Sequence, residues 1–168
     1  MKIGCDIPAL AAEVLDLCRS RGLTIGTVES CTGGLVAAAL TEIPDSSDVV
    51  MAGLVTYSNA AKTSLAHVPQ GLLDRHGAVS EDVARAMATG GRERLGVDLC
   101  VAITGIAGPG GGSAEKPVGL VWLALADSGG VSAQRVNLGS QGRAVIRMEA
   151  VALALLMLKD AASGFRLA

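Results

Sequence analysis

A serine between a short β-prone segment and two glycines is the first candidate for chemistry in this sequence. Ser30 follows the segment 24–28 and precedes a helical stretch over 35–41. The N–H groups of a first helical turn are unpaired and lie at the positive end of the helix dipole, so they can hold an oxyanion beside a nucleophile. Gly33 and Gly34 would let the backbone approach a substrate. The ordinary alternative, favoured for Ser30 taken alone, is that Ser30 or Thr32 only caps the helix.

A serine nucleophile needs a base, and the sequence favours Lys62 over either histidine. His67 precedes a Val-Pro pair and His76 precedes glycine, which is typical of loops or helix ends. A desolvated lysine loses basicity towards neutral pH and can then accept a serine proton. Tyr57, the only tyrosine, ends a predicted strand five residues before Lys62, so both side chains can reach one crevice. A solvated surface lysine is the commoner alternative.

A glycine-rich run over 104–113 resembles a phosphate-binding loop in composition. The spacing from Gly105 onward matches a Walker A loop, but Gly111 stands where that motif requires lysine. An anion-binding loop and a flexible connector are equally good interpretations. Arg143 and Arg147, near the start of the last predicted helix, can supply charge for a phosphate, although such arginines are often only solvated.

The elements that must position these residues alternate between helices and short apolar strands. Helices are predicted over about 8–22, 35–41, 59–65, 80–95 and 143–158, and strands over 24–28, 49–57, 99–104, 118–126 and 131–138. This order predicts an α/β fold, a three-layer α/β/α sandwich on a mostly parallel mixed sheet with one late hairpin. Ligands bind outside the carboxyl ends of strands in such sheets. Ser30, Tyr57 and Thr104 each fall at or just past such an end, which indicates a site.

The composition restricts the partners and the compartment. The 168 residues fit a single domain over 1–168, half of them are apolar, and the net charge is −2 without a basic stripe, which argues against nucleic acid. The cysteines at 5, 18, 31 and 100 lack metal-ligand spacing, so they are expected to be reduced and no metal is expected. The apolar runs 118–126 and 150–158 are too short to span a membrane. We therefore expect a cytoplasmic protein with no membrane partner.

A homo-oligomer, most simply a dimer, is predicted from the segment Ala150 to Leu158. This segment is apolar around every face of a helix, whereas a helix on one side of a sheet needs a single apolar stripe. A subunit interface would cover the remainder, and twofold closure is the commonest arrangement. The alternative is that Phe165, Leu167 and the first helix cover it within one chain.

Several motifs taken together resemble the C-terminal domain of the CinA competence/damage-inducible family over nearly the whole chain. They are Glu-Ser-Cys-Thr-Gly-Gly at 29–34, Thr-Tyr-Ser-Asn-Ala-Ala-Lys at 56–62, Gly-Ala-Val-Ser at 77–80, Thr-Gly-Ile-Ala-Gly-Pro at 104–109 and Lys-Pro-Val-Gly at 116–119. Members of that family include nicotinamide mononucleotide deamidases, which hydrolyse the carboxamide to nicotinate mononucleotide and ammonia. Relatives also occur fused to a larger N-terminal domain, which we do not expect in these 168 residues.

The resemblance implies a Ser/Tyr/Lys catalytic set and a nucleotide substrate, with no metal or organic cofactor. Ser30, Tyr57 and Lys62 correspond to the catalytic set. The matching substrate-binding residues are Cys31, Thr32, Gly33, Gly34, Asn59, Thr104, Gly105, Gly108 and Arg143. Relatives often read Gly-Asp-Arg where this chain has Gln141-Gly142-Arg143, so Arg143 matches the basic residue and the acidic residue is missing.

Two other hypotheses compete with that of a serine amidohydrolase. A non-catalytic nucleotide-binding module would use the same crevice and would tolerate loss of Ser30. A cysteine hydrolase would use Cys31, because a thiolate is favoured at a helix N-terminus, although no histidine is evidently placed beside it.

Overall fold

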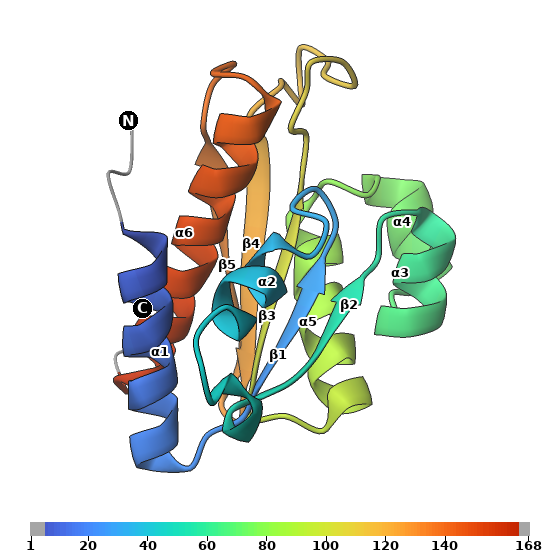
Figure 1. Cartoon of the computed structure of the whole chain (residues 1–168). Helices are drawn as coiled ribbons and strands as arrows, with labels where there is room; N and C mark the ends of the chain where they lie inside the picture. Colours follow the sequence, from blue (N-terminus) through green and yellow to red (C-terminus); the bar gives the residue numbers. More distant parts are fainter. Residues whose placement is uncertain (1–5, 165–168) are drawn as a thin grey trace.

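The computed structural model describes residues 6–164 and shows a five-stranded mixed sheet between two helical layers (Figure 1). The strands are β1 (Ile25–Glu29), β2 (Val50–Val55), β3 (Leu99–Gly105), β4 (Leu120–Asp127) and β5 (Gly130–Asn137), in the order β2-β1-β3-β4-β5. β2, β1 and β3 are mutually parallel, whereas β4 and β5 form the antiparallel hairpin predicted from the sequence. The predicted α/β/α sandwich is confirmed.

Each face of the sheet carries its own helices and its own hydrophobic core. One face carries α1 (Ile7–Arg21), α2 (Leu35–Thr41) and α6 (Arg143–Ala162), and the other carries α3 (Asn59–Ala66), α4 (Gln70–His76) and α5 (Glu81–Leu95). β3 is buried along nearly its whole length because both cores enclose it. Strands covered on both faces need apolar side chains in both directions, which explains their unbroken apolar runs.

Local capping signals fix most helix boundaries. The side chain of Ser58 accepts a hydrogen bond from Ala61 N–H at the start of α3, and Ser80 accepts one from Val83 N–H at the start of α5. Gly22 ends α1 in a left-handed conformation with φ of 64°. The sequence did not predict α4 or the 3₁₀ turn η1 (Ser46–Asp48), because neither has a side-chain cap and each buries a single residue.

The order of the strands places a switch point beside Ser30. The chain leaves β1 through α2 on one face to reach β2, and then returns through α3, α4 and α5 on the other face to reach β3. The next two strands in sequence, β2 and β3, therefore lie on opposite sides of β1. The connections that leave β1 and β3 diverge at the carboxyl ends of these strands. Such a divergence is where open α/β sheets bind ligands. Ser30 follows β1 there, as predicted.

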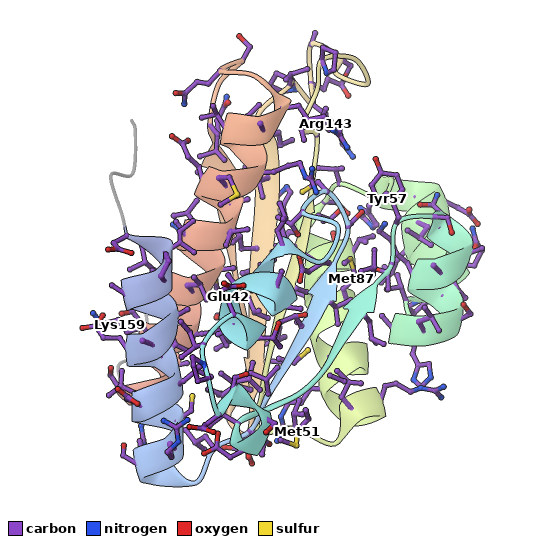
Figure 2. The ribbon with its side chains drawn as sticks, viewed as in Figure 1. Glu42, Met51, Tyr57, Met87, Arg143 and Lys159 are labelled. Carbon is purple, nitrogen blue, oxygen red and sulfur yellow. The ribbon has the colours of Figure 1, made fainter. Side chains whose placement is uncertain are left out.

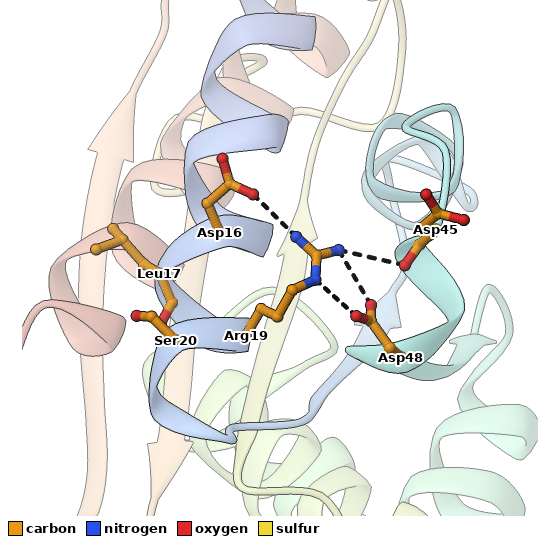
Figure 3. A network of polar contacts seen from close by, with 6 residues as sticks. All are labelled: Asp16, Leu17, Arg19, Ser20, Asp45 and Asp48. Atoms are coloured by element: carbon orange, nitrogen blue, oxygen red, sulfur yellow. Dashed lines mark hydrogen bonds and ion pairs between the residues drawn. The ribbon is translucent and has the colours of Figure 1, made fainter.

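A network around Arg19 ties α1 to the turn before β2 (Figure 3). This turn precedes the start of β2, whereas Ser30 follows the end of the parallel strand β1, so the two lie at opposite ends of the sheet. The Arg19 guanidinium donates to both carboxylate oxygens of Asp48, at 2.6 and 3.1 Å, and to Asp16 at 2.9 Å. The hydrogen bonds to Asp48 raise the pKa of Arg19, and the same contact lowers the pKa of Asp48. Exposed ion pairs add little stability, so this network mainly fixes the geometry of the edge.

α6 is buried by its own chain, so its apolar faces do not require a subunit interface to cover them. From Ala150 to Leu158 every side chain is buried or half-buried, against α1, α2 and the sheet. The exposed large apolar side chains of α6 are instead Val145 and Met148, in its first two turns. The homodimer stays a prediction, and Phe165 and Leu167 lie outside the described residues. Neither α6 nor any other helix within 6–164 is long and apolar enough to cross a membrane.

Candidate active site

A direct contact between Lys62 and Ser30 forms the centre of the site. Lys62 lies in the first turn of α3, and its side chain is only 1% exposed. Its Nζ lies 2.9 Å from Ser30 Oγ and donates a 2.7 Å hydrogen bond to the Thr56 carbonyl oxygen. No carboxylate within residues 6–164 lies within 4 Å of this Nζ. Lys62 is therefore a buried amine without a counter-ion, in contact with a hydroxyl.

Burial controls the protonation of Lys62. Loss of hydration disfavours the ammonium form and lowers the pKa of Lys62 below its ordinary value, while the neighbouring Cys31 acts in the opposite direction. A larger fraction of Lys62 is therefore neutral than for a surface lysine. The neutral amine has the lone pair that a general base needs, 2.9 Å from the Ser30 hydroxyl.

The pH dependence of turnover should report this amine. Because protonated Lys62 cannot accept the Ser30 proton, we expect kcat/KM to fall as the pH drops through the pKa of Lys62. The midpoint should lie below 10.5, the ordinary lysine value, because burial lowers it. A pH–rate profile of the purified protein measures this, with unfolding temperatures recorded over the same range. A midpoint at or above the ordinary value would contradict a desolvated lysine base.

The turn after Ser30 leaves two backbone donors without an oxygen or nitrogen acceptor. Among the described residues, no oxygen or nitrogen acceptor is hydrogen-bonded to the N–H groups of Cys31 and Thr32. The Gly33 N–H donates to the Ser30 carbonyl, and the Gly34 N–H donates to the Glu29 carboxylate. Neither glycine therefore has an N–H available to bind a ligand. Gly33 and Gly34 instead serve the turn through their left-handed φ values of 61° and 95°.

A cavity of about 210 Å³ opens onto the Ser30–Lys62 pair. It is lined by Ser30, Cys31, Tyr57, Lys62, Ala78, Val79, Thr104, Gly105, Ala107 and Arg143. A second cavity of about 480 Å³ lies at the other end of the sheet, between the β4–β5 turn and the end of α6. The larger cavity has no serine–lysine pair, so we assign the chemistry to the smaller one.

Tyr57, between β2 and α3, and Arg143, at the start of α6, both line this cavity and point toward one another (Figure 2). Tyr57 is 62% exposed, and its hydroxyl accepts a 3.2 Å hydrogen bond from the Arg143 guanidinium, which also donates to the Gly108 carbonyl at 3.0 Å. The Tyr57 hydroxyl has no hydrogen bond to Ser30 or Lys62. Tyr57 thus lines the cavity but does not stand between Lys62 and Ser30.

Only some of the remaining predicted site residues line the cavity. Thr104 and Gly105 line the cavity, with the Thr104 hydroxyl bonded to the Ala78 carbonyl at 2.8 Å. Asn59 lies exposed at the start of α3, and it is not among the cavity residues. The cavity is also lined by Ala78, Val79 and Ala107, which were not predicted from the sequence. All three fall inside the motifs at 77–80 and 104–109, which is the signal that would have found them.

Neither histidine nor Cys31 is arranged as a nucleophile or base. His67 caps the end of α3, and His76, at the end of α4, lies 3.5 Å from Asp82; both are exposed and outside the cavity, as predicted. Burial raises the pKa of the Cys31 thiol to about 11, so the thiolate is disfavoured near neutral pH. These observations count against the cysteine hydrolase.

The fold and the site together define a small α/β domain with a serine–lysine pair at the carboxyl edge of its sheet. The model of the CinA C-terminal domain matches residues 8–162, and the chain belongs to this family.

Named relatives and solved structures agree with this assignment. The chain is 50% identical over 145 residues to a CinA-like protein of Prochlorococcus marinus, which covers 86% of this chain and 34% of the relative. The competence/damage inducible protein CihA of Agrobacterium tumefaciens superposes with a TM-score of 0.91 at 48% identity, covering 95% of this chain and 96% of that one. A CinA superfamily protein of Klebsiella pneumoniae also gives 0.91, at 34% identity over 96% and 100% of the two chains. The chain spans about a third of the length of the curated relatives that it matches.

Proposed function

We propose that this chain is an amidohydrolase that removes ammonia from the carboxamide of nicotinamide mononucleotide. The observation that carries the proposal is the buried Lys62 amine, 2.9 Å from Ser30 Oγ and without a counter-ion in the described chain. Burying a lysine without a carboxylate partner destabilises the folded state. A role as a neutral general base gives a functional reason for this placement. Membership of the CinA family supports the substrate class through the resemblance stated above.

The mechanism proposed is acyl transfer through Ser30. Neutral Lys62 takes the hydroxyl proton as Ser30 Oγ attacks the amide carbon, and the resulting oxyanion accepts hydrogen bonds from N–H groups in the turn that follows Ser30. The amide nitrogen then leaves as ammonia with the proton from Lys62. Water adds to the acyl-enzyme and gives its proton to Lys62, and Lys62 returns that proton to Ser30 Oγ as the acid leaves. The direct Lys62–Ser30 contact favours Lys62 as the immediate base in this proposal, with Tyr57 outside the proton path.

The cavity and its mouth suit the two ends of such a substrate. Ligand pockets commonly measure roughly 300–1,000 Å³, so a space of about 210 Å³ fits the amide-bearing ring rather than a whole nucleotide. The rest of the molecule would extend past Arg143 at the mouth. Arg143 and Arg147 have no carboxylate within 4 Å among the described residues. The charge of Arg143 and the glycine-rich loop bonded to it favour an anionic group at the mouth, whereas Arg147 donates to the Thr32 carbonyl at 2.8 Å and is not among the lining residues.

The substrate phosphate should therefore matter. We expect nicotinamide riboside, which lacks the phosphate, to have a kcat/KM about 10- to 100-fold below that of the mononucleotide, because a charge-assisted contact is lost. Remote binding energy also orients the reacting amide, so kcat should fall as well as KM rise. Arg143→Ala should narrow the difference between the two substrates. Equal kcat/KM values for both substrates in the unmodified protein would refute a phosphate contact.

The non-catalytic binding module is the second candidate. It accounts for the cavity and for the arginines, but it gives no reason to bury an amine against a serine hydroxyl. Ammonia release from the mononucleotide separates the two functions, because a binding module would retain the nucleotide without turnover.

A further inference from the structure

Glu29 is a buried carboxylate for which the mechanism above has no use. It is the last residue of β1, it directly precedes Ser30, and it is 0% exposed. Among residues 6–164, no lysine, arginine or histidine nitrogen lies within 4 Å of its oxygens. A buried carboxylate without a cation requires several hydrogen-bond donors to hold it. The positions of these donors therefore indicate the role of Glu29.

The donors to Glu29 come from beyond the nucleophile. One carboxylate oxygen accepts the N–H groups of Gly34 and Val36, at 3.0 and 3.1 Å. The other accepts the Ala37 N–H at 2.9 Å and the Thr27 hydroxyl at 3.3 Å. The side chain therefore spans the whole turn that contains Ser30 and ties the end of β1 to the start of α2.

These bonds decide which backbone donors remain beside Ser30. The N–H groups of Ser30, Gly33 and Leu35 donate to carbonyl oxygens, and those of Gly34, Val36 and Ala37 donate to Glu29. Only the N–H groups of Cys31 and Thr32 are left between positions 30 and 37 in the described chain. The N–H of the residue after a nucleophile is a common oxyanion donor in acyl-transfer enzymes.

The position of Glu29 distinguishes it from an ordinary helix cap. Capping side chains normally belong to the N-cap residue itself, which is Gly34 in α2 and has no side chain. Gly34 has a φ of 95°, which disfavours any L side chain, so the acceptor for this helix start has to come from another residue. The carboxylate comes instead from five residues earlier, across Ser30.

We propose that Glu29 is a positioning residue that directs the Cys31 and Thr32 N–H groups at the oxyanion formed when Ser30 attacks. It does so by holding both ends of the turn and by occupying the N–H groups of α2 that would compete for the same anion. The proposal rests on the acyl-transfer function above, since it assigns the donors for that reaction.

Glu29→Gln tests this assignment because it preserves size but replaces one acceptor oxygen with an NH₂ donor. Whichever way the amide is oriented, at least one of the three backbone N–H groups loses its acceptor. The turn should then shift, and misplacement by about 1 Å can lower a rate about 100-fold. We expect kcat for the mononucleotide to fall by about 10- to 100-fold, with KM within about threefold of wild type. The matched control is Glu42→Gln at the exposed other end of α2 (Figure 2), which should leave both constants unchanged.

A second readout does not depend on the substrate. An alkyl fluorophosphonate reacts when serine Oγ forms a bond to phosphorus, the P–F bond breaks, fluoride leaves, and the hydroxyl proton passes to Lys62. The phosphoryl oxygen then needs the same N–H donors as the oxyanion. We expect Glu29→Gln to slow labelling of Ser30, followed by mass spectrometry, by about 10-fold or more. Glu42→Gln should be labelled at the wild-type rate.

The outcomes separate this inference from the proposed function. If wild type is labelled at Ser30 and labelling slows in Glu29→Gln, the assignment stands even where no ammonia is released, and only the substrate proposal fails. Wild-type labelling and wild-type kcat in folded Glu29→Gln would overturn it. A raised KM with unchanged kcat would also overturn it, because Glu29 would then affect substrate binding instead. Unfolding temperatures of both variants confirm that the rates refer to folded protein.

Discussion

Ser30→Ala is expected to abolish ammonia release, by roughly 10⁴-fold or more, because the hydroxyl that forms the acyl bond is gone. Cys31→Ala should keep activity within about fivefold, since it preserves the backbone N–H and removes only a thiol whose pKa burial raises to about 11. Steady-state ammonia release at saturating mononucleotide measures both. The opposite pattern, with Ser30→Ala active and Cys31→Ala inactive, would identify Cys31 as the nucleophile.

The same Ser30 variant bears on the binding-module reading. Ser30→Ala should still bind the mononucleotide by calorimetry, because the cavity walls and Arg143 are unchanged. Retained binding with lost turnover indicates a chemical role for the hydroxyl. If the single variants Ser30→Ala and Cys31→Ala were both fully active, neither residue would be a covalent nucleophile.

Lys62→Ala is expected to lower kcat by about 10²- to 10⁴-fold, the range for loss of a general base. Lys62→Arg should not restore it, because a guanidinium stays protonated and cannot take the Ser30 proton. Ser64→Ala, at an exposed position of the same helix, is the matched control and should behave as wild type. Near-normal turnover in Lys62→Arg would show that this position supplies charge alone.

Tyr57→Phe gives the internal comparison for Lys62. Its hydroxyl contacts Arg143 and not Ser30, so its loss should lower kcat much less than loss of the amine. A Tyr57→Phe defect as large as that of Lys62→Ala would instead place the phenol in the proton path. The two variants measured together decide which residue is the immediate base.

Local signals predicted most of the fold. Ser58, Ser80 and Gly22 mark helix boundaries through bonds to residues within a few positions, so a short stretch of sequence contains the information. α4 has no such signal: it follows Pro69 without a side-chain cap and buries only Leu73. α6 shows the opposite limit, because its apolar faces are covered by helices distant in sequence.

Most of the residues that line the cavity were predicted from the sequence, but their contacts were not. Strand ends brought Ser30, Tyr57 and Thr104 to one edge, as the sequence indicated. Which of Tyr57 and Lys62 touches Ser30 depends on packing between residues about thirty positions apart, which no local pattern records. Glu29 had a visible signal, an acidic residue ending an otherwise uncharged strand, but its partners follow only from the turn's geometry.

The central claim is hydrolysis of an amide by the Ser30–Lys62 pair, and one assay tests it most directly. Purified protein is incubated with nicotinamide mononucleotide, and ammonia and nicotinate mononucleotide are quantified beside a Ser30→Ala sample. We predict equal amounts of both products from wild type and none above background from the variant. Bound but unconverted mononucleotide in the wild-type sample, with no more ammonia than Ser30→Ala releases, would contradict the account.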